Sequence, residues 1–247
     1  MGERTYRLTL AYDGTRYRGW QRLPGTELTI QGKVEAALTD VFGRPIEIDG
    51  SGRTDAGVHA AGQVASFRAP ALPLSTLLGR LRHLLPEDIG VLAADYAPDR
   101  FHARLSAVEK TYVYRVWNSE LPDVFGRRFR TPVPQCLDLA AMEAGAALLL
   151  GTHDFMAFCA NKHMKKSSVR TLRRLELLQE GEELRFELTA DGFLYHMVRI
   201  IVGTLLEIGL GKRSPDCIPA LLEGRNRALA GETAPARGLC LMEVRYQ

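Results

Sequence analysis

Several features are scarce in this sequence of 247 residues, and each scarcity excludes a class of protein. No run approaches the roughly 18 consecutive apolar residues of a membrane-spanning helix, so no membrane association is expected. The first residues, MGERTYRLTL, lack the apolar stretch of a signal peptide, and we expect a cytoplasmic protein. The four cysteines lie far apart, without the close pairs of zinc or redox sites, and are expected to be reduced packing residues.

An excess of charge of one sign is also missing, because 32 lysines and arginines nearly balance 29 aspartates and glutamates, for a net charge of +3. This total neither requires nor excludes a nucleic-acid partner. The basic residues are unevenly placed, however. Residues 155–174 contain six lysines and arginines with His163 and no acidic residue, and Arg127, Arg128 and Arg130 form a second group. A solvated loop remains the alternative interpretation of each run.

A third basic segment, DGTRYRGWQRLPG at residues 13–25, interleaves arginines with Tyr17 and Trp20. Guanidinium groups bind phosphates and aromatic rings stack on unpaired bases, so this pattern is typical of RNA binding. Tyr17 and Trp20 are equally suited to packing the loop against a core. The sequence leaves both interpretations open.

Hydrophobic periodicity predicts the same order of elements, βαββαβ, in each half of the chain. The first half contains expected strands at Thr5 to Tyr12, Pro45 to Asp49, Gln63 to Arg68 and Ile89 to Tyr96, with helices around Val34 to Val41 and Leu77 to Leu85. The second half contains expected strands at Thr111 to Trp117, Thr171 to Gln179, Leu184 to Ala190 and Leu239 to Tyr246, with helices at Leu139 to Leu150 and His196 to Gly209 and an extra helix near Pro215 to Glu223.

This order indicates an α+β fold of two RRM-like, or ferredoxin-like, units, each an antiparallel sheet with its helices on one face. We place the domains at residues 1–105 and 106–247. The halves share no visible sequence period, so the repeat is one of architecture. An active-site cleft is expected where the two domains meet.

The segment GSGRTDAGVHAAG, residues 50–62, is the strongest candidate for chemistry. Its glycines allow a close approach of the backbone, and a simple turn does not require Arg53, Asp55 and His59 within seven residues. A guanidinium beside a carboxylate favours the ionised form that a nucleophile needs, and Arg53 lies two positions from Asp55. We therefore predict a site at Asp55, with a turn as the alternative.

These residues resemble a known family, the TruA-type tRNA pseudouridine synthases, whose signature is similar to SGRTDAGVHA. Four further segments resemble that family's motifs in the family's order, and together they span nearly the whole chain. They are YDGTRYRGWQR at residues 12–22, FHARLSA at 101–107, KTYVYR at 110–115 and FLYHMVRIIVGTL at 193–205.

The resemblance implies an enzyme that converts uridine to pseudouridine at positions 38, 39 and 40 of the tRNA anticodon stem-loop, without a metal or other cofactor. It implies Asp55 as the nucleophile, Arg53 as a tRNA contact important for catalysis and Tyr112 against the target base. Arg199 is implied as the ion-pair partner of Asp55, so it competes with Arg53 for that role. The sequence does not decide whether Asp55 adds to C6 of the base or acts at C1′ of the sugar.

The resemblance also implies a homodimer that shares the tRNA between its subunits. Implied tRNA contacts lie in two segments: Phe101, His102, Ala103, Arg104 and Leu105, and Lys162, His163, Met164, Lys165 and Lys166. The second segment coincides with the basic run identified from charge alone. Tyr112 is also a candidate for removing the C5 proton, because its hydroxyl is expected near the ring.

Two other classes of protein remain as alternatives. A non-catalytic RNA-binding protein explains the topology and the charge, but it does not need Asp55 in a glycine-rich turn. A metal-dependent hydrolase using Asp55 and His59 is the other, although the remaining histidines show no paired spacing and favour a structural His59. An Arg199 in an apolar helix predicts a carboxylate nearby, and Tyr112 and Tyr114 are alternatively core aromatics.

Overall fold

The computed structural model describes residues 2–161, 164 and 166–247, which form a mixed α/β fold with five α-helices among them. The chain divides into two compact units, which are described separately. The first comprises Met1–Val108 and Cys240–Gln247, and the second comprises Glu109–Leu239. Residues 240–247, at the end of the chain, therefore belong to the first unit, whereas the sequence-based division assigned them to the second.

The first unit contains a sheet built on a long antiparallel pair of strands. Its strands are β1 (Glu3–Tyr12), β2 (Asp49–Gly50), β3 (His59–Pro70), β4 (Ile89–Ala97) and β10 (Leu239–Tyr246), and its helices are α1 (Ile30–Phe42) and α2 (Leu74–Leu84). Strand β1 lies between β4 and β3 and is antiparallel to both, so that Leu8 pairs with Ala94 and Ala65. The short β2 pairs antiparallel with β3, and β10 pairs parallel with it at His59 and Ala60.

Local sequence explains the two helices of this unit. The hydroxyl of Thr29 accepts a hydrogen bond from the N–H of Gly32 and caps α1, which ends at Gly43 in the left-handed conformation (φ 68°). The face of α1 predicted from the periodicity, including Val34 and Leu38, is buried. Helix α2 ends before Pro86, as expected.

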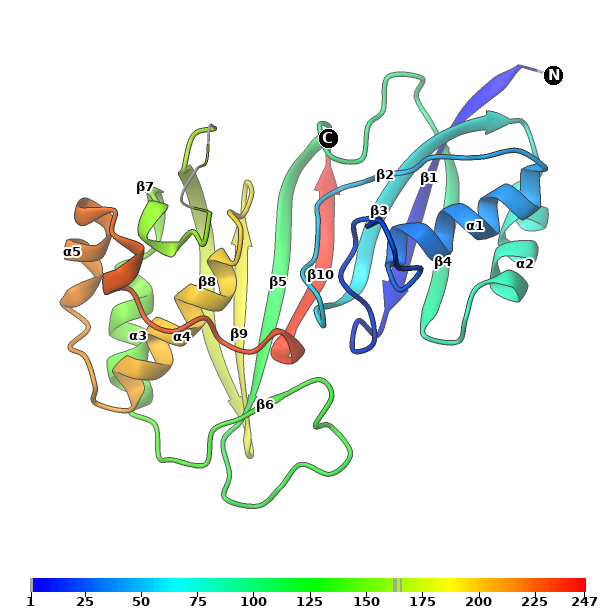
Figure 1. Cartoon of the computed structure of the whole chain (residues 1–247). Coiled ribbons are helices and arrows are strands. Elements are labelled where there is room, and N and C mark those ends of the chain that lie inside the picture. Colours follow the sequence, from blue (N-terminus) through cyan, green and yellow to red (C-terminus); the bar gives the residue numbers. More distant parts are fainter. Residues whose placement is uncertain (1, 162–163, 165) are drawn as a thin grey trace. The chain divides into compact units, whose positions relative to one another are not determined.

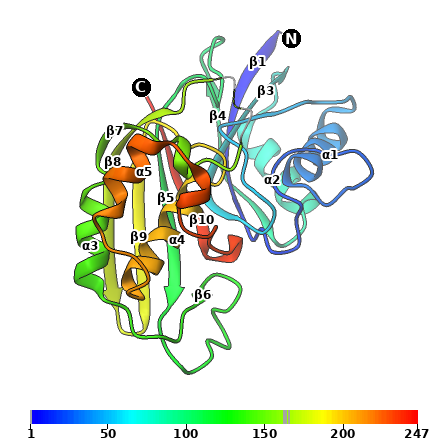
Figure 2. The ribbon, with the colours of Figure 1, turned by 60° about the vertical axis from the view of Figure 1, so that its left-hand side comes forward.

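The second unit contains a sheet in the order β5-β9-β8-β7. Its strands are β5 (Ala107–Trp117), β6 (Thr131–Pro132), β7 (Gly151–Asp154), β8 (Val169–Glu180) and β9 (Glu183–Ala190). Its helices are α3 (Leu139–Ala147), α4 (Met197–Gly209) and α5 (Cys217–Gly224), with 3-10 turns at Met156–Phe158, Arg227–Leu229 and Ala236–Gly238. Helix α3 packs against α4 and β8 (Figures 1 and 2).

Helix α4 is the most deeply buried helix, which explains its apolar sequence. Ile200, Ile201 and Leu205 are fully buried, and Gly203 lies against the backbone of the segment that leads to β10. A Cβ at Gly203 would be 1.8 Å from the carbonyl oxygen of Glu232, so glycine is required there. None of the described helices combines the length and the apolar character needed to cross a membrane.

The sequence prediction was wrong for some short elements. The strand expected at Pro45 to Asp49 is mostly loop, because only Asp49 and Gly50 pair with β3. Strands β6 and β7 were not predicted, since two to four residues are too few to show a period. The other expected strands and helices are confirmed, with ends shifted by a few residues.

Tyr114 of β5 is predicted to make the stability of the fold depend on pH in the alkaline range. Its hydroxyl is 2.7 Å from Thr131 Oγ1 and donates to the carbonyl oxygen of Pro235 at 2.8 Å. Burial raises its pKa from 10.0 to about 12. Because the unfolded chain loses this proton near pH 10 and the folded chain keeps it, we expect the free energy of unfolding to fall as pH rises from 10 to 12. The contribution of Tyr114 is about 2 kcal/mol.

Denaturant titrations of the native protein and of Tyr114→Phe at several values between pH 8 and pH 12 measure this effect. Below pH 10 the variant is expected to be less stable by about 1 kcal/mol, because Thr131 and Pro235 lose a hydrogen-bond partner. The difference should shrink or reverse by pH 12. Two parallel curves over the whole range would contradict the assignment of this titration to Tyr114.

Candidate functional site

Asp55 lies in the loop between β2 and β3, and buried side chains from the sheet hold that loop in place. The hydroxyl of Tyr12 is 2.9 Å from Thr54 Oγ1. Ser51 Oγ donates to Gln63 Oε1 at 2.6 Å, and Gln63 Nε2 donates to the carbonyl oxygen of Gly52 at 3.0 Å. The residue next to Asp55 is thereby fixed by a hydrogen bond inside the core, which limits the movement of the carboxyl group.

The segment at residues 13–25 packs directly against the Asp55 loop. The N–H of Trp20 donates to the carbonyl oxygen of Thr54 at 3.0 Å, and the N–H of Gly57 donates to that of Tyr17 at 3.3 Å. Gly19 has φ 98°, and a Cβ there would be 2.7 Å from the carbonyl oxygen of Thr54. The glycine-containing motifs recognised separately in the sequence therefore form one structure.

The aromatic residues of this segment pack into the core. Tyr17 and Trp20 are each 2% exposed, which favours the packing interpretation over stacking on bases. The Tyr17 hydroxyl donates to Asp88 at 2.6 Å, and burial together with this hydrogen bond raises its pKa to about 12. Arg16 also pairs with Asp88.

The remaining arginines of the segment differ in their charge pairing. Arg22 pairs with Glu35 at 3.0 Å and with Glu47 at 3.3 Å. Arg18 is exposed and makes no ion pair within the described part of the chain. Arg18 is consequently the arginine of this segment best placed to meet a phosphate.

His59 has a structural role in supporting the loop. Its Nδ1 accepts a hydrogen bond from the N–H of Gly14 at 3.0 Å, and the ring is 3% exposed. Asp13 Oδ1 lies 3.2 Å from the same nitrogen. Among residues 2–161, 164 and 166–247, no group of three or more His, Cys, Asp or Glu side chains is arranged to hold a metal ion.

Asp55 is half-buried, and its carbonyl oxygen accepts from the N–H of Val58 at 3.1 Å, which closes a turn. Gly57 occupies the left-handed region of that turn, with φ 79°. Arg53 is exposed and forms no ion pair in the described residues. The pairing of Arg53 with Asp55 that the sequence spacing suggested is therefore not observed.

Tyr112 and Arg199 both belong to the second unit. Tyr112 lies on β5 opposite Leu188 of β9, is 8% exposed and packs edge-to-face on Phe193, with ring centroids 5.1 Å apart. Arg199 lies in the first turns of α4 and is partly exposed. Its Nε donates to the carbonyl oxygen of Ala234 at 2.7 Å, and the N–H of Ala234 donates back to the Arg199 carbonyl oxygen at 3.0 Å.

The start of α4 is conformationally unusual. His196, its N-cap residue, has φ 62°, a left-handed conformation that is uncommon for residues other than glycine. Its ring stacks on Tyr195 with centroids 3.8 Å apart. Backbone strain of this kind is frequent at functional sites, and it directly precedes the turn that carries Arg199.

The segment Phe101 to Leu105 presents only some of its side chains to solvent. Ala103 is fully buried, its N–H donates to Ser66 Oγ at 2.9 Å, and its carbonyl oxygen accepts from Tyr246 at 2.8 Å. The ring of Phe101 lies 4.9 Å from that of Tyr246. Arg104 and Leu105 are exposed, whereas Ala103 serves as the anchor of the segment.

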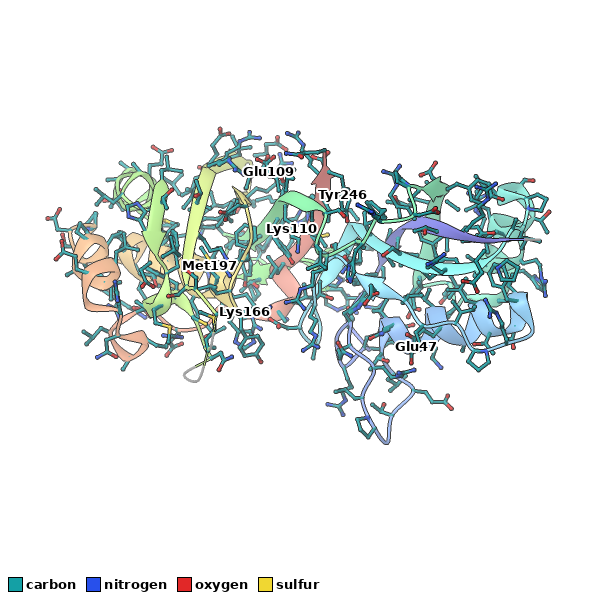
Figure 3. The ribbon with its side chains drawn as sticks, turned by 90° about the horizontal axis from the view of Figure 1, so that it is seen from above. Glu47, Glu109, Lys110, Lys166, Met197 and Tyr246 are labelled. Carbon is teal, nitrogen blue, oxygen red and sulfur yellow. The ribbon has the colours of Figure 1, made fainter. Side chains whose placement is uncertain are left out.

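The basic run near residue 165 is only partly described. Lys162, His163 and Lys165 lie outside the described residues. Met164 is half-buried, and Lys166 is exposed (Figure 3). Arg173 and Arg174, at the end of the run, pair with Glu109 and Glu176 at 3.2 Å and 2.7 Å. A count of the basic residues in this run therefore overestimates the positive charge of the surface, because glutamates outside the run lie next to two of its arginines.

Several supporting residues could not be recognised from the sequence. Tyr12, Thr54 and Gln63 form the hydrogen-bonded support of the Asp55 loop, but they come from three separate segments. A period-two strand pattern places Tyr12 and Gln63 on β1 and β3 without revealing that their polar ends meet. The only available signal was the presence of Gln63 at a position expected to be buried, since a buried amide needs partners.

Comparisons with known proteins agree with one another. A family model described as tRNA pseudouridine synthase matches residues 9–105 and 146–247. The chain is 49% identical over 243 residues to tRNA pseudouridine synthase A of Moorella thermoacetica, covering 97% of this chain and 98% of that protein. It is 43% identical over 244 residues to the protein of the same name from Acetivibrio thermocellus, covering 98% and 100%.

The chain also has a partial similarity to a solved structure. A crystal structure of a Cbf5-Nop10-Gar1 complex matches with a TM-score of 0.38 and 12% identity, over 96% of this chain and 48% of that chain. This chain thus spans about half the length of the chain that it matches. The match of the curated relatives, by contrast, extends over nearly the full length of both proteins.

Proposed function

The chain belongs to the tRNA pseudouridine synthase family and isomerises uridine in tRNA, and from this premise we propose that it acts at positions 38, 39 and 40 of the anticodon stem-loop with Asp55 as its nucleophile. The relatives are named tRNA pseudouridine synthase A, so a pseudouridine synthase explains the chain better than a non-catalytic RNA-binding protein or a hydrolase. The observation that carries the proposal is the position of Asp55 in a loop held from both sides by Tyr12, Trp20 and Gln63.

The reaction breaks the bond between C1′ and N1, rotates the uracil and forms a bond between C1′ and C5. The C5 proton is then removed and N1, freed from the sugar, gains a proton, so the substrate and product have the same composition. We propose that the Asp55 carboxylate assists by adding to C6 or by acting at C1′. A base inside a stem must first leave the stack, and we propose that the exposed Arg18 and Arg53 bind the flanking phosphates during this step.

We assign the other groups to supporting roles. Arg199 is proposed to pair with the Asp55 carboxylate, because a partly buried guanidinium in an apolar helix requires a compensating charge or carbonyl groups. Its hydrogen bond to Ala234 fixes the direction of the guanidinium. Arg53, exposed on the same loop as Asp55, is proposed to contact the tRNA backbone. Tyr112 is proposed to lie against the uracil and to accept the C5 proton.

We also propose that Phe101, His102, Ala103, Arg104 and Leu105, with Lys162, His163, Met164, Lys165 and Lys166, form tRNA-contacting segments. For Ala103 any such contact involves the backbone, because the side chain is buried. We further propose a cytoplasmic homodimer that shares the tRNA between subunits. Each unit is proposed to be RRM-like, with domains dividing near residue 105. The order β1 α1 β2 β3 α2 β4 and the antiparallel pairs of the first unit support this topology.

A positional assay tests the proposed substrate specificity. Anticodon stem-loops that carry a single uridine at position 38, 39 or 40, labelled with tritium at C5, are expected to release the label, whereas a stem-loop with its uridine at position 36 is not. The short RNA folds in monovalent salt, so EDTA can be included and is expected to leave release unchanged, because no step above uses a metal. Release only from position 36, or none from 38 to 40, would contradict the proposed positions.

A further inference from the structure

The second unit contains a cavity of about 460 Å³ that none of the proposed catalytic groups lines. Its lining residues come from the end of β5, from the loop between Asn118 and Arg130, from β6 and from Arg237. That loop leaves the end of β5 and returns to it at β6 (Figure 1). Its volume falls within the range of about 300 to 1,000 Å³ that is usual for small-ligand sites. Its apolar wall consists of Trp117, Pro122, Val124 and Pro132.

The Trp117 ring is held in a fixed orientation. Its Nε1 donates to the carbonyl oxygen of Leu121 at 2.7 Å, and the guanidinium of Arg130 lies over the ring at 5.4 Å from the centroid. Arg130 in turn pairs with Asp123 at 2.7 Å and with Glu183. A tryptophan fixed in this way offers a preorganised surface for a flat ligand.

The charge of the cavity is positive once its internal pairs are counted. Burial tends to raise the pKa of Asp123, but hydrogen bonds from Arg130 and from the N–H of Gly126 outweigh it and keep that pKa below its ordinary value. Asp123 is therefore ionised and is already paired with Arg130. Arg127 and Arg237 also line the cavity, are exposed, and make no ion pair within the described residues. One N–H of Arg127 donates to the carbonyl oxygen of Val124, and its charge also helps to lower the pKa of Asp123, while its other N–H groups remain for a ligand. Two guanidinium groups are thus available to an anion.

The loop that lines the cavity also carries an exposed aromatic side chain. Phe125 is 98% exposed, next to Leu121 at 73% and Val124 at 56%. Such apolar exposure in a loop with several arginines is unusual for a surface that contacts only water. Arginine together with exposed aromatic rings is the combination that binds unpaired nucleotides, by phosphate contact and by base stacking.

We propose that this cavity binds one unpaired nucleotide of the tRNA, distinct from the uridine that is isomerised. The base lies against Trp117 and the neighbouring prolines, and the phosphate group contacts Arg127 and Arg237. The proposal rests on tRNA being the substrate, and it adds a second point of attachment that fixes the position of the stem-loop. It does not depend on which uridine reacts or on the role of Asp55.

The charge argues for RNA over a second copy of this chain. In a two-fold symmetric dimer the same patch of each subunit meets its counterpart, so an interface centred here would bring Arg127 and Arg237 close to the same two arginines. Like charges at short distance oppose such an interface. A polyanion, in contrast, neutralises both arginines and releases bound counterions.

Binding of an unmodified full-length tRNA transcript at a series of salt concentrations tests the proposal. The double variant Arg127→Gln and Arg237→Gln is expected to raise Kd about 10- to 100-fold and to lower the slope of log K against log salt by about 1 to 2. Trp117→Leu is expected to raise Kd about 5- to 100-fold without a change in slope. In both variants KM is expected to rise while kcat is kept, because the contact is made equally before and during the reaction.

The matched control is the double variant Arg4→Gln and Arg82→Gln, which removes two exposed arginines of the first unit that make no ion pair in the described residues. Its Kd and salt slope are expected to stay close to those of the native protein. Equal losses in both double variants would indicate a general charge effect and would overturn the proposal. Thermal melting shows whether Trp117→Leu is folded, and the two surface arginine changes keep the test valid if it is not.

Two further measurements separate the possible outcomes. A tRNA transcript containing 4-thiouridine is expected to crosslink under ultraviolet light to the peptide that contains Trp117 or Arg127, through an unpaired nucleotide. If light scattering instead shows that the arginine variants change oligomeric state with tRNA binding unchanged, the cavity is a contact between copies and the proposal is wrong. The positional assay and the binding measurement can fail independently. If no label is released from positions 38 to 40 but the cavity variants still bind tRNA more weakly, the proposed positions are wrong and the cavity proposal stands.

Discussion

Replacement of Asp55 with asparagine is expected to reduce tritium release from tRNA labelled at uracil C5 by about 1,000-fold or more, the scale typical of losing a catalytic nucleophile. The change keeps the size of the side chain and removes only its negative charge and nucleophilic oxygen. The loop is held by hydrogen bonds of Thr54 with Tyr12, of Ser51 with Gln63 and of Gly57 with Tyr17, and these three bonds use atoms other than the Asp55 carboxyl group. We therefore expect the loop to stay folded and the Kd for tRNA to remain near that of the native protein, while the loss of the proposed pair with Arg199 lowers the thermal midpoint.

Asp40→Asn is the matched control for this experiment. Asp40 is exposed on α1, and the change alters net charge by the same amount. Its rate of tritium release is expected to equal that of the native protein. Substantial release by Asp55→Asn under single-turnover conditions would exclude Asp55 as the nucleophile. A loss of tRNA binding in Asp55→Asn would point instead to a role in substrate recognition.

Replacement of Gly14 with alanine is expected to produce the largest loss of stability among single methyl additions near the site. The new Cβ would be 2.0 Å from the carbonyl oxygen of Val58 and 2.6 Å from its carbonyl carbon. Both atoms belong to backbone that enters β3, so the clash cannot be relieved by a side-chain rotation. We expect the free energy of unfolding to fall by about 2 to 4 kcal/mol, as for severe overpacking.

The same change is expected to lower activity beyond its effect on the folded fraction. Gly14 donates its N–H to His59, and movement of Val58 is transmitted to Asp55 through the turn that joins them. A shift of about 1 Å in a reacting group commonly costs about 100-fold in rate. Tritium release measured below the melting temperature, corrected for the folded fraction, isolates this effect.

Gly79→Ala is the matched control for Gly14→Ala, and it is expected to increase stability. Gly79 lies within α2, and a Cβ there meets no atom within 4 Å. Alanine is the better helix former, so the variant is expected to be more stable by about 1 kcal/mol, with unchanged activity. Chemical denaturation of the native protein, Gly14→Ala and Gly79→Ala measures these differences in the free energy of unfolding. If Gly14→Ala is as stable as Gly79→Ala, the close packing of the two motifs against each other is incorrect.

The sequence predicted most of the elements because their signals are local. The i, i+3, i+4 spacing of Val34, Leu38 and their neighbours identified α1, and Pro86 marked the end of α2. The sequence was misleading where the environment of one segment depends on contacts with a distant segment. The loop with Tyr17 and Trp20 has the composition of an RNA-binding surface, yet both rings are buried, with the Tyr17 hydroxyl bonded to Asp88 and the Trp20 ring near that of Tyr12.

The family could be identified from the sequence alone, because SGRTDAGVHA is a contiguous motif, and Asp55, the residue that we propose as nucleophile, lies within it. The support of that residue was decided only by the tertiary structure. Tyr12, Gln63 and Gly14 are distant along the chain, and hydrogen bonds and steric fit between distant residues leave no periodic trace in a single sequence.

Contacts between distant residues also decide which arginines are paired with carboxylates and which can bind a ligand. By its own residues the sequence determined a cationic chain segment, a mixed α/β fold and a carboxylate in a glycine-rich turn. Only the fold decided that Arg130, Arg173 and Arg174 face carboxylates while Arg127 and Arg237 share a cavity with Trp117. Charge is a property of a residue, but its compensation is a property of neighbours that folding brings together.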